Sequence, residues 1–180
     1  MFGGEVVQFS QSADGIVISL PPQAWQSPDT IVVLDFDASV AGAQVKVFPS
    51  GSLARGKPVR ASNVYQGLAA WGPSKAVDDD PDTRWATDAG VHSAWLEVDL
   101  EQPFTIGRAI ISEAFDRVRR FELQRLEGEQ WVTFFAASRI GQMAEFTFPP
   151  VTTSRVRLNI LEATDGPTIW EFQLFPPQGK

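Results

Sequence analysis

The stretch SAWLEVDL, residues 93–100, alternates apolar and polar side chains over its last five positions. In a β-strand, alternate side chains point to opposite faces, so this pattern places the apolar set on one face and the acidic set on the other. The same period of two recurs in FELQ at residues 121–124 and in VRLNI at residues 156–160, while helical spacing of apolar residues is nearly absent. The sequence therefore predicts an all-β protein.

Turn-forming residues separate the alternating runs. They are Asp14-Gly15, Gly72-Pro73, Glu127-Gly128, Pro149-Pro150 and Asp165-Gly166-Pro167. Turn signals at such intervals are typical of antiparallel sheets packed face to face. We expect an antiparallel β-sandwich of the jelly-roll type.

The composition shifts once, at PSGSLARGKP, residues 49–58. Before it, residues 1–48 hold four strand-like runs, EVVQFS, GIVISLP, TIVVLDFD and the shorter AQVKVF. These runs are too few to bury both faces of a sheet. We expect an incomplete set of strands in residues 1–48, which either packs on a main domain at residues 49–180 or ends a sandwich whose earlier part is missing.

Charge and composition exclude several functions. The chain carries 22 acidic and 15 basic side chains, a formal net charge of −7, which repels nucleic acids and anionic membranes. There is no cysteine, and the single histidine, His92, does not make a zinc site alone. No apolar run is long enough to cross a bilayer, and the first ten residues do not resemble a signal peptide, so we expect any export signal to lie upstream.

The segment DDDPDTRW, residues 78–85, places four carboxylates within five positions. An EF-hand reading fails, because Thr83 and Ala89 stand where that loop needs glycine and glutamate. Two interpretations stay open: a solvated turn built by Asp and Pro, or an irregular loop whose oxygens bind calcium and relieve the repulsion among the acids.

Five segments in order resemble a discoidin domain, also called a coagulation factor 5/8 type C domain, which in bacteria is carbohydrate-binding module family 32. They are LARGKPVRASNVYQG, WGPSKAVDDDPDTRWATD, SAWLEVDLEQPFTIGRAII, RVRRFELQRLEGEQWVTF and SRVRLNILEATDGPTIWEFQLF. The resemblance covers roughly residues 52–176. It implies a galactose-binding-like jelly roll that binds glycans and holds a structural calcium ion.

The first part of the chain resembles a more specific group of proteins. EVVQFSQSADGIVISLPPQAWQSPDTIVVLDFD resembles the closing strands of the C-terminal sandwich of bacterial α-L-fucosidases of glycoside hydrolase family 29, and RWATD and ISEAFDRVRRFEL are similar to fucosidase-linked modules. The resemblance implies a parent glycosidase, secreted or periplasmic in a bacterium, whose catalytic domain precedes these strands. As an isolated module, we expect a monomer.

The resemblance also implies which residues surround the calcium ion. The family's positions fall on Lys75, Asp78, Asp80, Thr83, Trp170 and Glu171. Lys75 and Thr83 would contribute backbone oxygens, Thr83 also its hydroxyl, and Asp78 its carboxylate. Asp80 would contribute a backbone or side-chain oxygen.

The last strand would close this calcium shell through the carbonyl of Trp170 and the carboxylate of Glu171. Asp79 stands where the family usually has glycine, and Asp tolerates left-handed backbone better than most residues. We expect Trp85 to pack beneath the loop as part of the core, and Asp82 to face solvent.

A sugar site needs an aromatic face and planar polar groups. In the galactose-binding relatives a histidine follows the loop tryptophan, whereas this chain has Ala86, which puts the usual galactose site in doubt. The candidates here are Trp71, Glu113, Phe115, Arg117 and Arg119, with His92 as an outsider. Each has a plainer interpretation: the aromatic rings are as consistent with closing the end of the sandwich, and the arginines with the solvent face of a strand.

Three other functions compete with glycan binding. Retaining glycosidases need two carboxyls about 5 to 5.5 Å apart, but the fucosidase barrel needs about 250 residues and no such segment is present, so we expect no catalysis. Animal discoidin domains adhere to proteins or membranes, a role that a contiguous exposed apolar patch on the loops would favour. A purely structural accessory role is the third.

Overall fold

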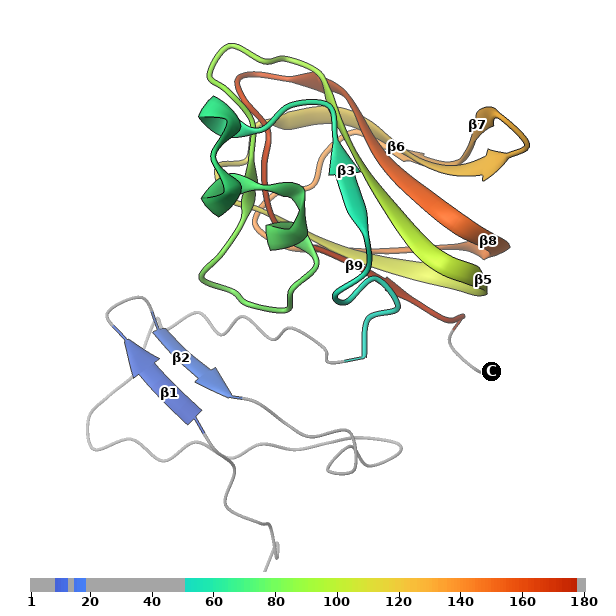
Figure 1. The fold of residues 1–180 in the computed structure, drawn as a ribbon, viewed down its shortest axis with the longest axis horizontal. Helices are drawn as coiled ribbons and strands as arrows, with labels where there is room; N and C mark the ends of the chain where they lie inside the picture. Colours follow the sequence, from blue (N-terminus) through green and yellow to red (C-terminus); the bar gives the residue numbers. More distant parts are fainter. Residues whose placement is uncertain (1–8, 13–14, 19–50, 178–180) are drawn as a thin grey trace, which may run out of the picture. The chain divides into compact units, whose positions relative to one another are not determined.

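The computed structural model describes residues 9–12, 15–18 and 51–177, and the chain divides into two units, residues 1–51 and 52–180 (Figure 1). In the first unit, β1 (Phe9–Ser12) and β2 (Gly15–Ile18) pair antiparallel. β2 lies within the predicted run GIVISLP, whereas β1 shares only Phe9 and Ser10 with the predicted run EVVQFS and extends two residues beyond it. The predicted runs at residues 30–37 and 43–48, and the packing expected for residues 1–48, lie outside the described residues.

The second unit consists of antiparallel strands and short 3₁₀ turns. The strands are β3 (Val59–Ala61), β4 (Trp85–Ala86), β5 (Ala94–Glu113), β6 (Val118–Glu127), β7 (Gln130–Ala137), β8 (Ala144–Ala163) and β9 (Thr168–Phe175). The 3₁₀ turns η2 (Tyr65–Gly67), η3 (Ala69–Trp71) and η4 (Pro73–Ala76) lie between β3 and β4. The predicted all-β, antiparallel fold is confirmed.

The two long strands, β5 and β8, take part in both layers of the sandwich. The first half of β5 pairs with β3 and with the second half of β8, and its second half pairs with β9 and with the first half of β8. The register breaks between Asp99 and Phe104, where Glu101 has a φ of 67° and Pro103 lacks an N–H donor. One layer is therefore β7-β6-β8-β5-β3, and the other is β8-β5-β9-β4.

Pro149 and Pro150 lie inside β8 and do not end it. The register break between Ile106 and Arg108 places them in a bulge opposite Gly107. Proline is tolerated there because a bulge needs no ladder hydrogen bond from its nitrogen. The turn predicted at this dipeptide is wrong for that reason: pairing resumes on both sides of the bulge.

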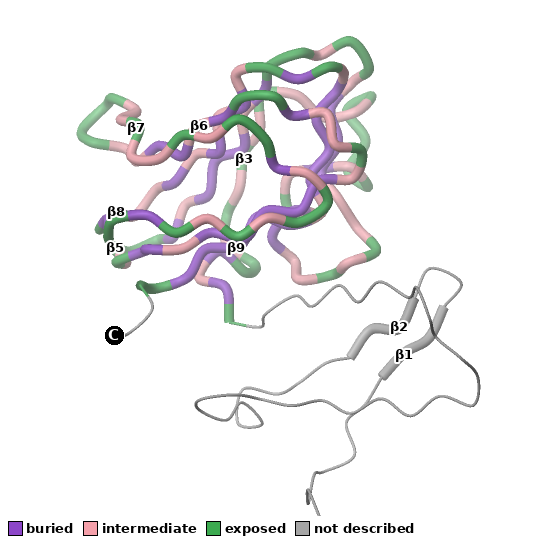
Figure 2. The backbone as a smooth tube through the Cα atoms, turned by 180° about the vertical axis from the view of Figure 1, so that it is seen from behind, coloured by how far each residue is buried: buried purple, intermediate pink, exposed green. Residues whose placement is uncertain are grey.

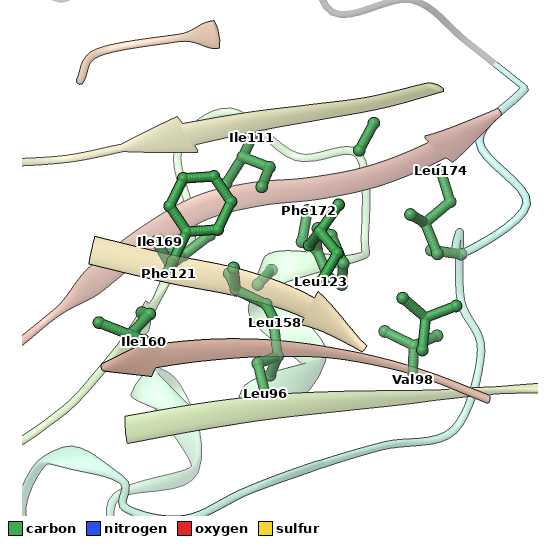
Figure 3. Close-up of a cluster of buried hydrophobic side chains, with 14 of the residues drawn as sticks. Leu96, Val98, Ile111, Phe121, Leu123, Leu158, Ile160, Ile169, Phe172 and Leu174 are labelled. Carbon is green, nitrogen blue, oxygen red and sulfur yellow. The ribbon is translucent and has the colours of Figure 1, made fainter. Parts of the chain in front are cut away.

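The core lies between the two layers (Figure 3), and Figure 2 shows buried positions recurring along β5, β6, β8 and β9. Every residue of the predicted apolar sets is exposed by 1% or less: Leu96, Val98, Leu100, Phe121, Leu123, Val156, Leu158 and Ile160. Phe172 and Leu174 of β9 contribute from the facing layer. Trp85 is also 0% exposed, as predicted, and its indole N–H donates to the carbonyl of Asn63 at 2.9 Å.

The bend in β5 decides where the loops gather. Because this strand doubles back, its first residue, Ala94, and its last, Glu113, lie at the same end of the sandwich, where β9 also begins. The 3₁₀ turns lie at that end, opposite the bend (Figure 1). Loops that are far apart in the sequence thus form a single surface, which we call the loop end.

Candidate functional site

Hydrogen bonds tie the loops of the loop end to one another. The hydroxyl of Thr87 donates to the carbonyl of Pro167 at 3.1 Å, and the N–H of Gly90 donates to Asp165 Oδ1 at 2.7 Å. A Cβ added to Gly166 would lie 2.5 Å from the carbonyl oxygen of Asp88, so glycine permits this close approach. The loop end is therefore a braced surface, on which side chains keep fixed positions.

The aromatic residues of the loop end surround one guanidinium group. The Cζ of Arg84 lies 4.7 Å from the ring centroid of Trp71, 4.5 Å from that of Trp170 and 5.5 Å from that of Phe115. Tyr65 packs edge-on against Trp71, with ring centroids 6.3 Å apart. We call Trp71, Arg84, Phe115 and Trp170 the aromatic cluster.

Arg84 is half-buried and lacks polar partners. Its Nε is buried without a hydrogen bond, and the side chain forms no ion pair with any residue of the described segments. Burial lowers the pKa of Arg84 because it penalises the charged form. Ring faces partly compensate this cost through cation–π contacts.

Two of the residues predicted to bind sugar belong to the aromatic cluster, and a third adjoins it. Trp71 is partly exposed, Phe115 is 53% exposed, and the Cζ of Arg117 lies 4.5 Å from the Phe115 ring centroid. Arg117 Nη1 donates to the carbonyl of Gly166 at 2.8 Å, and Nη2 lies 3.3 Å from Asp165 Oδ2. Arg117 is thus held between two loops with its charge compensated.

The other predicted sugar residues have internal partners. Glu113 is 1% exposed, and its Oε1 accepts the N–H groups of Arg117 and Val118 at 2.6 and 2.8 Å, so it braces the 113–118 loop. Burial raises the pKa of Glu113, which these N–H groups partly offset. Arg119 Nη1 donates to the carbonyl of Asp116 at 2.9 Å. The His92 ring Nδ1 lies 2.8 Å from the carbonyl oxygen of Ala163, the last residue of β8.

Sequence reasoning missed Arg84 and the ring of Trp170, which it had considered only for its backbone carbonyl. The sequence contained a signal for both side chains. Arg84 precedes the buried Trp85, and Trp170 follows the buried Ile169, so in each extended pair one side chain enters the core and its neighbour turns outward.

The acidic loop beside the aromatic cluster is organised around Asp78. Both carboxylate oxygens of Asp78 lie 2.9 Å from the hydroxyl of Thr83, Oδ2 lies 3.2 Å from the ammonium of Lys75, and Oδ1 accepts the N–H of Asp80 at 3.3 Å. Lys75, Asp78, Asp80 and Thr83 are therefore brought together. Asp82 is exposed.

Asp79 adopts the left-handed backbone, with a φ of 57°, where the family usually has glycine. Its side chain has two partners: Gln173 of β9 donates to Oδ1 at 3.0 Å, and Arg55 Nε lies 3.2 Å from Oδ2. These contacts tie the acidic loop to the last strand and offset the strain of an aspartate at positive φ.

Glu171 of β9 carries a buried carboxyl group. It is 0% exposed, and neither Oε1 nor Oε2 has a hydrogen-bond partner among the described residues. Burial, followed by the negative charges of Asp79 and Asp78, raises the pKa of Glu171 to about 9. A buried carboxyl group without a partner, close to other acids, is the environment that a bound cation would neutralise.

Side chains alone do not form a metal-binding group within residues 51–177: no three His, Asp or Glu side chains there are arranged to hold an ion. The predicted shell draws part of its ligands from the backbone. The donors of the predicted shell are all oxygens, which suits a hard cation such as calcium. The buried Glu171 carboxyl, which has no hydrogen-bond partner, is consistent with such an ion.

A separate hollow of about 460 Å³ lies on the outer face of the β3-containing layer, lined by Ser62, Ser93, Ala94, Trp95, Asn159, Ile160 and Leu161. Beside it, the Cζ of Arg157 lies 4.6 Å from the Trp95 ring centroid and 4.0 Å from that of Trp131. This outer-face hollow is the structural alternative to the loop end as a ligand site.

Large apolar side chains are exposed at three described positions, Leu68, Phe115 and Met143, all on loops of the loop end. None of the helical segments in the described residues has the length and hydropathy required to cross a membrane.

Solved structures with this fold include modules and larger enzymes. A chitosan-binding module of a Paenibacillus sp. IK-5 chitosanase/glucanase is 26% identical, with a TM-score of 0.63, over 69% of this chain and 98% of that one. A Bacteroides thetaiotaomicron protein, provisionally named an alpha-L-fucosidase, is 25% identical with a TM-score of 0.66 over 72% of this chain. This chain spans 29% of that protein.

A Ruminococcus gnavus GH29 fucosidase in complex with fucose shares the fold, at 21% identity and a TM-score of 0.63, over 71% of this chain and 27% of its own. No curated protein sequence matches the chain. The model of the F5/8 type C domain matches residues 58–172. The chain therefore belongs to the F5/8 type C domain family, and is a binding domain and not a catalytic one.

Proposed function

We propose that the loop end binds a glycan through the aromatic cluster and thereby holds an attached glycosidase near its substrate. The observation that carries this proposal is the gathering of Trp71, Phe115 and Trp170 around Arg84 on a braced, solvent-facing surface. Aromatic faces cover the C–H surface of a sugar ring, while adjacent polar groups bond its hydroxyls. The 26% identity to a chitosan-binding module supports the same class of ligand.

The parent enzyme in this proposal is an α-L-fucosidase exported by a bacterium, and the glycan is of the galactose or fucose type. Fold similarity to two larger fucosidase chains supports a module of this kind next to a glycosidase domain. A shallow site that covers one sugar ring binds weakly, with a Kd of about 10 μM to 1 mM, and gains from being tethered to an enzyme.

The structural calcium ion belongs to the same proposal. The residues that would hold it are Lys75, Asp78, Asp80, Thr83, Trp170 and Glu171, through their carboxylates, backbone carbonyls and the Thr83 hydroxyl. Calcium would be the positively charged partner that the buried Glu171 carboxyl lacks. It would also fix the acidic loop to β9, next to the ring of Trp170.

Trp71→Ala is expected to weaken glycan binding at least about fivefold, because it removes a stacking face worth roughly 1 kcal/mol or more. The measurement is an NMR titration with galactose, fucose and N-acetyllactosamine-type glycans. Amide shifts should cluster at residue 71, residues 84–92 and residues 113–119. Trp131→Ala, on the outer face of β7, is the matched control and should leave the affinity unchanged.

Shifts that concentrate instead at Ser62, Trp95 and Asn159 would move the site to the outer-face hollow. If no glycan shifts either region, the glycan-binding proposal is wrong.

Calcium bound only by the folded state should stabilise it by about 2.7 kcal/mol at a hundredfold excess over its Kd. Asp78→Ala is expected to abolish most of this gain, because the residue contributes the central carboxylate of the acidic loop. Asp82→Ala, which removes an exposed acid of the same loop, should keep it. Thermal unfolding with calcium and with EDTA checks this, and identical melting curves in the two buffers would rule out the ion.

Adhesion to a membrane is a second candidate function, because Leu68, Phe115 and Met143 expose apolar side chains on the loop end. Co-sedimentation with zwitterionic and anionic vesicles distinguishes the two functions. Binding to vesicles that Phe115→Ala and Leu68→Ala abolish, without any glycan response, would favour adhesion.

A further inference from the structure

Arg84 differs from the other cations of the domain in having no acidic partner. Within residues 51–177, only Arg84 and Arg120 among the Lys and Arg side chains lack an ion pair. Arg120 is exposed on β6, where water solvates its charge. Arg84 is half-buried among aromatic rings, where solvation is poorer, and no carboxylate pairs with its charge at the proposed binding surface.

The geometry of Arg84 leaves part of its guanidinium group available to a ligand. Nε is buried and unbonded, whereas neither Nη atom is a buried atom without a partner, and no described residue accepts a hydrogen bond from them. Both Nη groups therefore remain in contact with solvent. Aromatic rings pack against the guanidinium, and its N–H groups, which lie in its plane, match the two oxygens of a carboxylate or sulfate.

The acids near the loop end have other partners. Asp116 is paired with Arg139 through two contacts, Asp165 with Arg117 and the N–H of Gly90, and Glu113 accepts backbone N–H groups. Asp80 and Asp82 are exposed, and neither forms an ion pair with Arg84. Nothing in the described residues neutralises this guanidinium.

We infer that the loop end selects acidic sugar residues, which carry a carboxylate or sulfate, over neutral and amino sugars, with Arg84 as the residue that binds the anionic group. This inference rests on the proposed function, and it names the class of glycan. The rings of Trp71 and Trp170 hold the guanidinium and offer the stacking surface, while the Nη groups bond the acid. The protonated amines of chitosan, the ligand named for the similar module, would instead meet an uncompensated positive charge.

The test compares trigalacturonate with its carboxyl-reduced neutral counterpart, which has the same sugar backbone. A sulfated galactose oligomer and chitotriose are the third and fourth ligands. NMR titrations of the wild-type domain should give an affinity for trigalacturonate at least about tenfold above that for the neutral trimer. The preference should shrink between 50 and 500 mM salt, since charge attraction is screened. The sulfated arm shows whether sulfate can replace carboxylate, and chitotriose should bind most weakly.

Arg84→Gln should remove the preference for the acid while keeping binding of the neutral trimer, because the stacking rings remain. Arg84→Lys should keep part of the preference, since it retains the charge without the planar fork. Arg120→Gln, which removes the other unpaired arginine, controls for net charge and should leave the affinities for the acidic and neutral trimers unchanged. If Arg84→Gln perturbs the fold, as its melting temperature would show, the wild-type comparison and Arg84→Lys still decide.

The possible failures are distinguishable. Equal affinity of the wild-type domain for the acidic and neutral trimers would overturn the inference and leave glycan binding intact. Tighter binding of chitotriose would overturn it too. If none of the four oligosaccharides shifts any resonance at the loop end, the proposed function fails together with the inference.

Discussion

Calcium-free protein is expected to lose stability as the pH rises from 4.5 towards 9, because of the carboxyl group of Glu171. Its pKa is about 9 in the folded state and 4.5 as the ordinary value, so at pH 7 the folded state keeps a proton that the unfolded state has released. Unfolding then releases a proton, and raising the pH favours the unfolded state. The loss accumulated between pH 4.5 and pH 7 is about 3 kcal/mol.

Urea unfolding in EDTA at pH 5, 7 and 8.5 measures this effect. Glu171→Gln should flatten the pH dependence, because the amide resembles the protonated carboxyl and does not titrate. Glu129→Gln, on an exposed turn, should leave the dependence unchanged. Saturating calcium should flatten it in the wild-type protein, since a cation favours the ionised carboxylate. An EDTA profile that is flat from pH 5 to 8.5 would show that Glu171 is ionised or solvated in the folded protein.

Trp85→Ala is expected to lower the free energy of unfolding by about 3 to 5 kcal/mol, the usual cost of removing a large aromatic side chain from a core. Trp85 is 0% exposed, pairs with Ile169 across β4 and β9, and its indole N–H satisfies the carbonyl of Asn63. The substitution therefore leaves both a cavity and an unpaired carbonyl.

Chemical denaturation followed by circular dichroism checks this prediction. Trp85→Phe should cost less, because it keeps most of the apolar volume and loses mainly the hydrogen bond. Trp131→Ala, on the outer face, should cost about 1 kcal/mol or less, since it breaks one cation–π contact with Arg157. Similar losses in the free energy of unfolding for Trp85→Ala and Trp131→Ala would contradict the prediction that Trp85 contributes more to stability than Trp131.

Alternation along the chain was enough to predict the sheet and its core. In SAWLEVDL the apolar positions Leu96, Val98 and Leu100 all proved buried, because one face of a two-layer sandwich must exclude water along its whole length. The acidic loop was also predictable, since Asp78 and Thr83 lie close together in sequence and need only a local turn to meet. A local sequence pattern indicates local backbone geometry and which face of a strand is buried, but it does not indicate contacts between distant segments.

The tertiary structure alone decided which side chains meet at the loop end. Trp71, Arg84, Phe115 and Trp170 come from four separate segments, which the bend in β5 and the start of β9 bring to one surface. The same packing buried Glu113 under its own loop and removed Glu171 from water. Whether a charged group is paired, stacked or buried depends on neighbours distant in the chain, because electrostatic energy depends on separation and solvent access in space and not on separation in sequence.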